Sequence, residues 1–314
     1  MAVGTRPIVP SRLAPGGVLG HERAKAPTTK AGAYLALTKP RIIELLLITT
    51  LPTMVVAAGK IPSVWLMAVT LVGGALAAGG ANAVNMYVDR DIDKLMPRTQ
   101  NRPLVTGAME PRNALVFALV LEVVAFAVLW SAVNLLSAVL ALSAMLFYVF
   151  VYTIWLKRTS TSNIVVGGAA GAVPVLVGWA AVRGSLGVAP WILFGAMFFW
   201  TPPHFWALAI RYADDYRAAN VPMLPAVADL RTVSRRMLFH TTLLVVCTLW
   251  FWRVAHLGWL YGGFAIVLGA AFVYGVLDLA RRPSAKRSMR LFAFSITYVT
   301  LLFLAMAADV LVRR

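Results

Sequence analysis

Charged residues are scarce in this 314-residue chain, and their scarcity excludes an ordinary soluble domain. They make up 13% of the sequence, whereas a soluble domain carries about 25%. Hydrophobic residues make up 60%, and the mean hydropathy is +0.78. This composition is typical of a chain that lies mostly within a lipid bilayer.

Acidic residues and cysteine are also few. The chain has 12 Asp and Glu against 29 Lys and Arg, which gives a formal net charge of +17. The basic residues occur in short clusters between apolar runs, as in membrane proteins, so we expect no nucleic-acid partner. The one cysteine, Cys247, lies within an apolar run and excludes an intramolecular disulfide and a cysteine-rich metal site.

The first 36 residues differ from the rest. They are rich in Pro, Gly, Ala, Lys and Arg and lack a helical apolar pattern, so we expect a mobile basic tail before a transmembrane domain at 37–314. No long apolar stretch precedes a small-residue cleavage site, which argues against a secretory signal. Three Arg and a single acid, Glu22, leave a mitochondrial presequence open, although hydroxyl residues are scarce.

The remainder predicts an all-α bundle around a central cavity, with about nine transmembrane helices. A spanning helix needs about 20 predominantly apolar residues. Candidate spans run at roughly 42–59, 64–87, 113–132, 135–155, 163–182, 188–209, 237–257, 259–279 and 289–311. Of the 29 basic residues, 24 fall in the tail and in the loops after even-numbered spans. The positive-inside rule then places the N-terminus and these loops in the cytoplasm.

Two acidic clusters lie on this basic side. Asn85, Asp89 and Asp93 are spaced four residues apart, so they would line one face if the second helix continues, whereas Asp91 would point elsewhere. Stacked carboxylates repel one another unless a cation lies between them, and Mg²⁺ binds through one or two carboxylates plus substrate phosphates.

Basic and acidic side chains beyond this helix complete the pattern. Arg98 and Arg102 follow the first cluster, and guanidinium groups bind phosphate well. The second cluster, at 214–217, follows the sixth span and is expected to close the same site. Metal-diphosphate chemistry is one interpretation of these residues, and ordinary solvated ion pairs are the other.

The sequence at these positions resembles the protoheme IX farnesyltransferase (heme O synthase) branch of the UbiA superfamily of intramembrane prenyltransferases. The resemblance covers roughly residues 37–310. It rests on the Asn85-x-x-x-Asp89-x-x-x-Asp93 spacing and on Leu37-Thr-Lys-Pro-Arg41, Met96-x-Arg98-Thr99, Arg102-Pro-Leu, Leu156-Lys-Arg158, Asn163-Ile-Val-Val-Gly-Gly168, Thr201-Pro-Pro-His-Phe-Trp206, Asp214-Asp-Tyr216 and Val221-Pro-Met-Leu-Pro225. One departure from the wider superfamily is that Asp215 is followed four residues later by Ala219, so the way a second metal is held stays open.

The resemblance implies transfer of a farnesyl group from farnesyl diphosphate to heme B, with addition of water, to give heme O. Mg²⁺ would be held by Asp89 and Asp93, with Asp215 from the second cluster. Asn85 would position the metal or the diphosphate. The remaining residues implied to bind substrate are Arg98, Arg102, Lys157, Arg158, His204, Asp214, Asp215 and Tyr216.

Aromatic residues and His204 have further implied roles. Tyr152 is the first candidate to stabilise the allylic cation through its ring face, with Trp200, Phe205 and Trp206 as alternatives. His204 follows Pro202-Pro203 and could ligate heme iron, bind a propionate or satisfy a packed hydrogen bond. Paired small residues such as Gly167-Gly168 are expected to allow close helix packing.

Three other functions stay open at this point. A related prenyltransferase acting on a quinone precursor, another tetrapyrrole or a lipid would share the aspartate motif. A transporter would have its acids at the midplane and not at the edge. A permanent heme carrier would need a second histidine facing His204. For heme synthesis we expect the bacterial plasma membrane in preference to the mitochondrial inner membrane, with a heme A synthase acting downstream.

Overall fold

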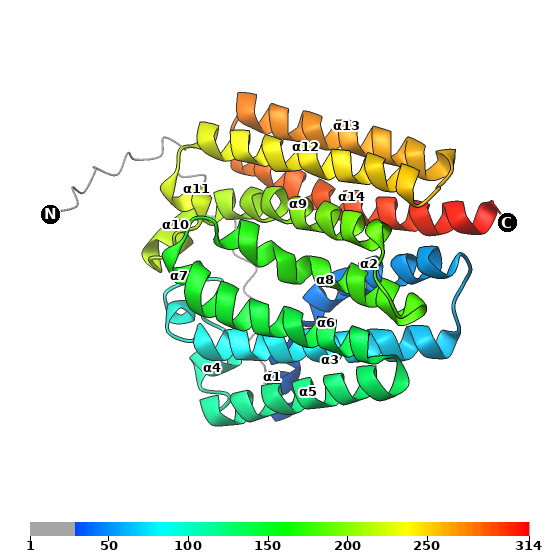
Figure 1. Ribbon diagram of the computed structural model, residues 1–314. Helices are drawn as coiled ribbons and strands as arrows, with labels where there is room; N and C mark the ends of the chain where they lie inside the picture. The colour runs from blue at the N-terminus through cyan, green and yellow to red at the C-terminus, as the bar shows by residue number, and fades with distance from the viewer. Residues whose placement is uncertain (1–28, 314) are drawn as a thin grey trace, which may run out of the picture.

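The computed structural model describes residues 29–313, and every regular element within that range is helical (Figure 1). Long helices run side by side along a common direction and form a bundle. They are α2 (Pro40–Ala58), α3 (Val64–Val88), α5 (Pro111–Ala132), α6 (Leu135–Leu146) continued by η2 (Phe147–Leu156) and α7 (Lys157–Thr159), α8 (Asn163–Arg183), α9 (Val188–Arg211), α12 (Leu230–Val254), α13 (Trp259–Arg281) and α14 (Ala285–Val312). The short elements are α1 (Lys30–Thr38), η1 (Ile92–Lys94), α4 (Pro103–Thr106), α10 (Ala213–Ala218) and α11 (Leu224–Val227).

Seven helices within the described residues are long and apolar enough to cross a membrane. They are α3, α5, the continuous Leu135–Thr159 segment, α8, α12, α13 and α14. The expected count of nine is therefore not confirmed. The two other expected spans correspond to α2, which contributes the shorter apolar stretch Ile48–Ala58, and to α9, whose prolines and His204 lower its hydropathy.

The short helices α4, α7, α10 and α11 all lie at the same end of the bundle (Figure 1). The tight connections between α2 and α3, α5 and α6, α8 and α9, and α12 and α13 lie at the opposite end with the C-terminus (Figure 1). The alternation of long and short connections thus places the 89–110 and 212–229 segments on the same side.

Helix α1 corrects the expected extent of the N-terminal tail. Most of that tail lies outside the described residues, but residues from Lys30 onward are helical. The Thr29 hydroxyl caps the helix by accepting from the Gly32 amide at 3.1 Å. Ala33 and Leu37 are buried against α3 and α5, and the Asn82 amide donates to the Thr38 carbonyl at 3.1 Å. The burial of Ala33 and Leu37 on one face therefore stabilises this short helix, because α3 provides the surface against which they pack.

The largest buried core lies between α8, α9, α12, α13 and α14. It contains Trp200, Trp206, Phe251 and Phe272. On the outer surface, large apolar side chains such as Trp155 and Tyr274 remain exposed. An apolar exterior is what a lipid-facing bundle requires, and together with the seven apolar helices it makes the chain a multi-pass membrane protein.

Candidate active site

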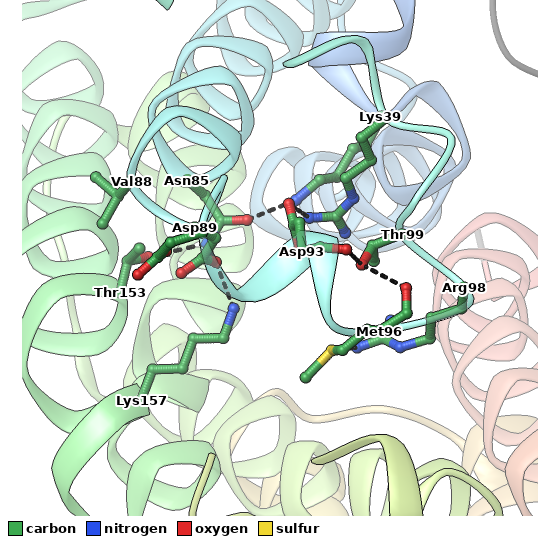
Figure 2. A network of polar contacts seen from close by, with 12 residues as sticks. Lys39, Asn85, Val88, Asp89, Asp93, Met96, Arg98, Thr99, Thr153 and Lys157 are labelled. Atoms are coloured by element: carbon green, nitrogen blue, oxygen red, sulfur yellow. Dashed lines mark hydrogen bonds and ion pairs between the residues drawn. The ribbon is translucent and has the colours of Figure 1, made fainter. Parts of the chain in front are cut away.

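The acidic motif lies where α3 ends. The helix stops at Val88, close to the end of the expected span 64–87, and Asp89 is its C-cap, so the helix does not continue through Asp93. The chain nevertheless keeps turning in the same direction. The Asp93 amide donates to the Asp89 carbonyl at 2.9 Å, and Asp93 itself lies in the short 3₁₀ helix η1. Asn85, Asp89 and Asp93 are therefore all buried at the same end of the bundle (Figure 2). The structure thus brings the three side chains to one end of the bundle without the continuous helix face on which their spacing argument depended.

Basic side chains from three other segments surround these acids. Lys157 forms an ion pair with Asp89 Oδ2, and Arg102 contacts Asp93 Oδ2 at 2.6 Å. Lys39, at the junction of α1 and α2, donates from Nζ to Asn85 Oδ1 at 2.8 Å. Burial lowers the pKa of Lys39 well below its usual value, and the nearby charges of Arg102 and Lys157 lower it further.

Asn85 connects the two halves of this network. Its amide nitrogen donates to Asp89 Oδ2 at 2.7 Å and to the Thr153 hydroxyl at 3.3 Å (Figure 2). Its amide oxygen accepts from Lys39. A side chain with donors on one side and an acceptor on the other fixes the relative position of the carboxylate and the ammonium group.

Asp91 points away from the motif, as its spacing predicts. Both of its carboxylate oxygens accept from Arg158 at 2.7 Å. This hydrogen bonding lowers the pKa of Asp91 to about 2, with a smaller opposing effect from burial. Arg158 also lies 3.7 Å from Asp89, so it links the exposed acid to the buried one.

The π-helical segment η2 delivers several site residues from a different helix. It carries Tyr148, Tyr152 and Thr153, and Lys157 follows directly. The Tyr152 ring stacks with Tyr148 at a centroid distance of 5.3 Å and packs against the backbone at Gly167 of α8. A π-helix widens the turn by one residue and is frequent at functional sites. It here places an aromatic ring and a lysine beside the acids.

The second acidic cluster lies on α10. Asp214 is 94% exposed and forms an ion pair with Arg217, whereas Asp215 Oδ2 is buried and has no hydrogen-bond partner within residues 29–313. Next to it, the Tyr216 hydroxyl accepts from Arg98 at 3.1 Å. The Arg98 guanidinium also lies over the Tyr216 ring, 5.4 Å from its centroid. This contact brings the loop after α3 and the segment after α9 together, as the sequence predicts.

The residues fit a metal ion only if a substrate supplies further ligands. Among residues 29–313, no three His, Cys, Asp or Glu side chains come close enough to hold a metal ion by themselves. Asp89 Oδ1 is buried without a hydrogen-bond partner in the same range, and it is the type of hard oxygen that Mg²⁺ prefers. Two carboxylates plus phosphate oxygens form an ordinary Mg²⁺ environment, so Asp89 and Asp93 are compatible with one.

His204 lies apart from the network of Figure 2, between α9 and α14. Its ring stacks against Trp200 and Phe292, and its Nδ1 lies 2.6 Å from the Ser295 hydroxyl. Trp200 and Trp206 are fully buried, which suits packing, whereas Phe205 is 40% exposed.

Sequence reasoning assigned no role to Lys39, Thr153 or Thr99. The Thr99 hydroxyl donates to the Asp93 carbonyl at 2.8 Å and so holds the turn that carries Asp93. Lys39 and Thr99 both fall within the motifs quoted for the resemblance, which is the signal that could have marked them. Thr153 had no such signal, because its approach to Asn85 depends on the packing of η2 against α3.

Known proteins resemble this chain over nearly its whole length. The family model of the UbiA prenyltransferase family matches residues 46–305. A protoheme IX farnesyltransferase of Saccharopolyspora erythraea is 53% identical over 92% of this chain and 94% of its own length. The corresponding enzyme of Parafrankia sp. is 50% identical over 99% of this chain and 98% of its own length.

Solved structures share the fold at low sequence identity. A digeranylgeranylglyceryl phosphate synthase covers 90% of this chain and 98% of its own with a TM-score of 0.75 at 16% identity. A UbiA homolog from Archaeoglobus fulgidus bound to DMAPP and Mg²⁺ covers 87% of this chain and 99% of its own with a TM-score of 0.63 at 17% identity. The chain belongs to the UbiA prenyltransferase family and, within it, to the protoheme IX farnesyltransferases.

Proposed function

We propose that this protein transfers the farnesyl group of farnesyl diphosphate to a vinyl group of heme B and so makes heme O. The observation that carries the proposal is the buried Asn85, Asp89 and Asp93 motif with basic side chains converging on it from three other segments. Relatives at about half identity are named for this reaction.

The basic residues suit a diphosphate leaving group. Arg102 and Lys157 form ion pairs with the motif and bring positive charge to one end of the bundle, and Lys39 donates a hydrogen bond to Asn85. In a site largely shielded from water, such fixed charges stabilise the negative charge that develops on the departing diphosphate. Arg98 and Arg158 lie at the edges of the same site and would bind further phosphate oxygens.

Asp89 and Asp93, together with Asp215 of α10, would hold Mg²⁺ with the diphosphate. When bound, Mg²⁺ would neutralise the diphosphate and favour its departure. Asn85 would keep Asp89 in position through its 2.7 Å hydrogen bond. Asp214 and Tyr216 would lie at the outer edge of the diphosphate site.

The reaction balances as an addition to the vinyl group. The bond between farnesyl carbon and diphosphate oxygen breaks, and the terminal vinyl carbon forms a bond to the farnesyl carbon. The adjacent carbon becomes positive and is quenched by water, which gives the hydroxyl and releases a proton. Tyr152, beside Lys157 on the same segment, would stabilise the cation through its ring face.

The loops that carry the site would face the cytoplasm of a bacterial plasma membrane. Of the 29 Lys and Arg, 24 belong to the N-terminal segment or to loops at the same end as the motif. Farnesyl diphosphate would therefore enter the site from the cytoplasm. Heme O would then pass to a heme A synthase, which supplies cofactor for heme-copper oxidases.

The test is a reaction with the detergent-purified protein, heme B, farnesyl diphosphate and Mg²⁺, analysed by chromatography and mass spectrometry. We expect a heme product that gains farnesyl plus water and is absent from Asp89→Asn and metal-free samples. Prenylation of a quinone precursor with no modified heme would keep the enzyme class and reject the acceptor. Heme binding without any prenylation would favour a carrier.

A further inference from the structure

Two short contacts join at the Ser295 hydroxyl, inside the interface of α9 and α14. Ser295 Oγ lies 2.6 Å from His204 Nδ1 and 2.6 Å from the Phe292 carbonyl oxygen. Ser295 is completely buried, so water does not replace either contact. The Ser295 carbonyl in turn accepts from Trp200 Nε1 at 2.8 Å, which ties α14 to α9 at the same level.

These distances fix the direction of each hydrogen bond. A serine hydroxyl has one hydrogen, and a backbone carbonyl can only accept. If the hydrogen pointed to His204, lone pairs of Ser295 Oγ and of the carbonyl would face each other at 2.6 Å. The hydroxyl therefore donates to the Phe292 carbonyl and accepts from His204, so Nδ1 carries the imidazole hydrogen.

Aromatic rings hold the imidazole on both faces. Trp200 stacks at a centroid distance of 4.2 Å with 19° between planes, and Phe292 at 4.6 Å with 27°. The plane of the ring is fixed by the stacking and its rotation by Ser295. A neutral imidazole with hydrogen on Nδ1 has its lone pair on Nε2, and metal-bound histidines usually donate their other ring N–H in this way.

We propose that Ser295 is a positioning residue that holds His204 with its Nε2 lone pair free to bind the iron of heme B. The inference rests on the proposed function and specifies how the acceptor is held. The His204 residue is 8% exposed, and in the proposed complex the edge of the ring that carries Nε2 would face the iron. Axial ligation would fix the macrocycle relative to α9, and the vinyl group would thereby be oriented for transfer.

The test compares two ligands of the same shape on the detergent-purified full chain: ferric heme B and metal-free protoporphyrin IX. Binding is followed by absorbance, with electron paramagnetic resonance for the heme. We expect His204→Gln to abolish the histidine-ligated heme spectrum and to leave protoporphyrin affinity unchanged. Ser295→Ala should weaken heme binding about tenfold without weakening protoporphyrin binding, and Ser295→Thr should restore it. A matched control is Thr297→Ala, because Thr297 is exposed on α14 and donates to Ala293 at 3.3 Å.

The outcomes separate the inference from the proposed function. Equal losses for heme and protoporphyrin would show that His204 contacts the macrocycle or a propionate, which overturns iron ligation. An unchanged heme spectrum in Ser295→Ala would overturn the positioning role. To guard against misfolding, His204→Gly is assayed with added imidazole, which should restore the ligated spectrum. Failure of the wild-type protein to make heme O while it binds heme through His204 would reject the proposed function alone.

Discussion

Lys39 and Asn85 are joined by a 2.8 Å hydrogen bond, although 46 positions separate them in the sequence. The contact brings the start of the bundle to the end of α3. It also orients the Asn85 amide, whose nitrogen is then directed at Asp89 and Thr153. A lysine held in this way places its amine beside the motif without an ion pair of its own to a carboxylate among the described residues.

Removing this amine should impair use of the diphosphate substrate. In Lys39→Met we expect kcat/KM for farnesyl diphosphate to fall about 10–100-fold, because hydrogen bonds to charged groups are worth about 1.5–3 kcal/mol. Steady-state kinetics with varied farnesyl diphosphate measure the effect. Lys60→Met is the control, since Lys60 is exposed at the other end of the bundle. Equal losses in both variants would contradict a specific role for Lys39.

Gly167 allows the Tyr152 ring to lie where it does. A Cβ at this position would lie 2.9 Å from Tyr152 Cγ and closer still to Cδ2, so the ring must move in Gly167→Ala. If the ring face stabilises the allylic cation, we expect kcat to fall roughly tenfold. Gly171→Ala is a matched control one turn later, because nothing lies within 4 Å of the Cβ it would add.

A second pair of variants tests the ring itself. Tyr152→Phe keeps the aromatic face and should retain most activity, whereas Tyr152→Leu should resemble Gly167→Ala. Comparable loss in Tyr152→Phe would assign the effect to the hydroxyl and reject the cation role.

The pair Asp91–Arg158 predicts a pH dependence of stability outside the working range. The pKa of Asp91 is lowered to about 2, below its value of about 3.9 in an unfolded chain. Its stabilising contribution is therefore present above about pH 4 and is lost as pH falls from about 4 to 2. Thermal unfolding in detergent should show Asp91→Asn slightly less stable than wild type at pH 6, with the difference vanishing near pH 2.

The exposed pair Asp214–Arg217 provides the comparison. Asp214 is 94% exposed, so Asp214→Asn should leave the unfolding temperature at pH 6 unchanged. A difference between Asp91→Asn and wild type that persists at pH 2 would mean that the ion pair is not its origin.

Sequence reasoning found the parts of this protein that local patterns determine. The apolar runs predict the long helices, and the Asn85, Asp89 and Asp93 spacing predicts a shared side at one end. The end of α3 at Val88 agrees to within one residue with the expected span 64–87, whereas the 3₁₀ turn that follows has no sequence signal, because it depends on the Thr99 hydroxyl bonding to the Asp93 carbonyl. The π-helix at Phe147–Leu156 has no sequence pattern, since a one-residue shift of the backbone hydrogen bonds leaves the apolar composition unchanged.

Contacts between segments that are distant in the sequence could not be predicted, because they depend on how the helices pack. Leu37 lies in a stretch too short and too basic to read as a helix, and it is ordered only because α3 and α5 bury it. The Ser295 contact to His204 requires the register of α14 against α9. A lone serine in an apolar helix gives no indication of that register.

The adjacent acids Asp214 and Asp215 offer the sharpest test of the metal proposal. Asp215 Oδ2 is buried without a hydrogen-bond partner in the described part of the chain, whereas Asp214 is exposed and paired with Arg217. If Asp215 shares Mg²⁺ with the diphosphate, Asp215→Asn should raise the Mg²⁺ concentration for half-maximal rate by about tenfold, a cost of about 1.4 kcal/mol. Asp214→Asn should leave it unchanged. Mg²⁺ titrations at saturating farnesyl diphosphate measure both. Equal shifts would indicate a general effect of lost negative charge, and no shift in Asp215→Asn would leave Asp89 and Asp93 as the metal-binding carboxylates.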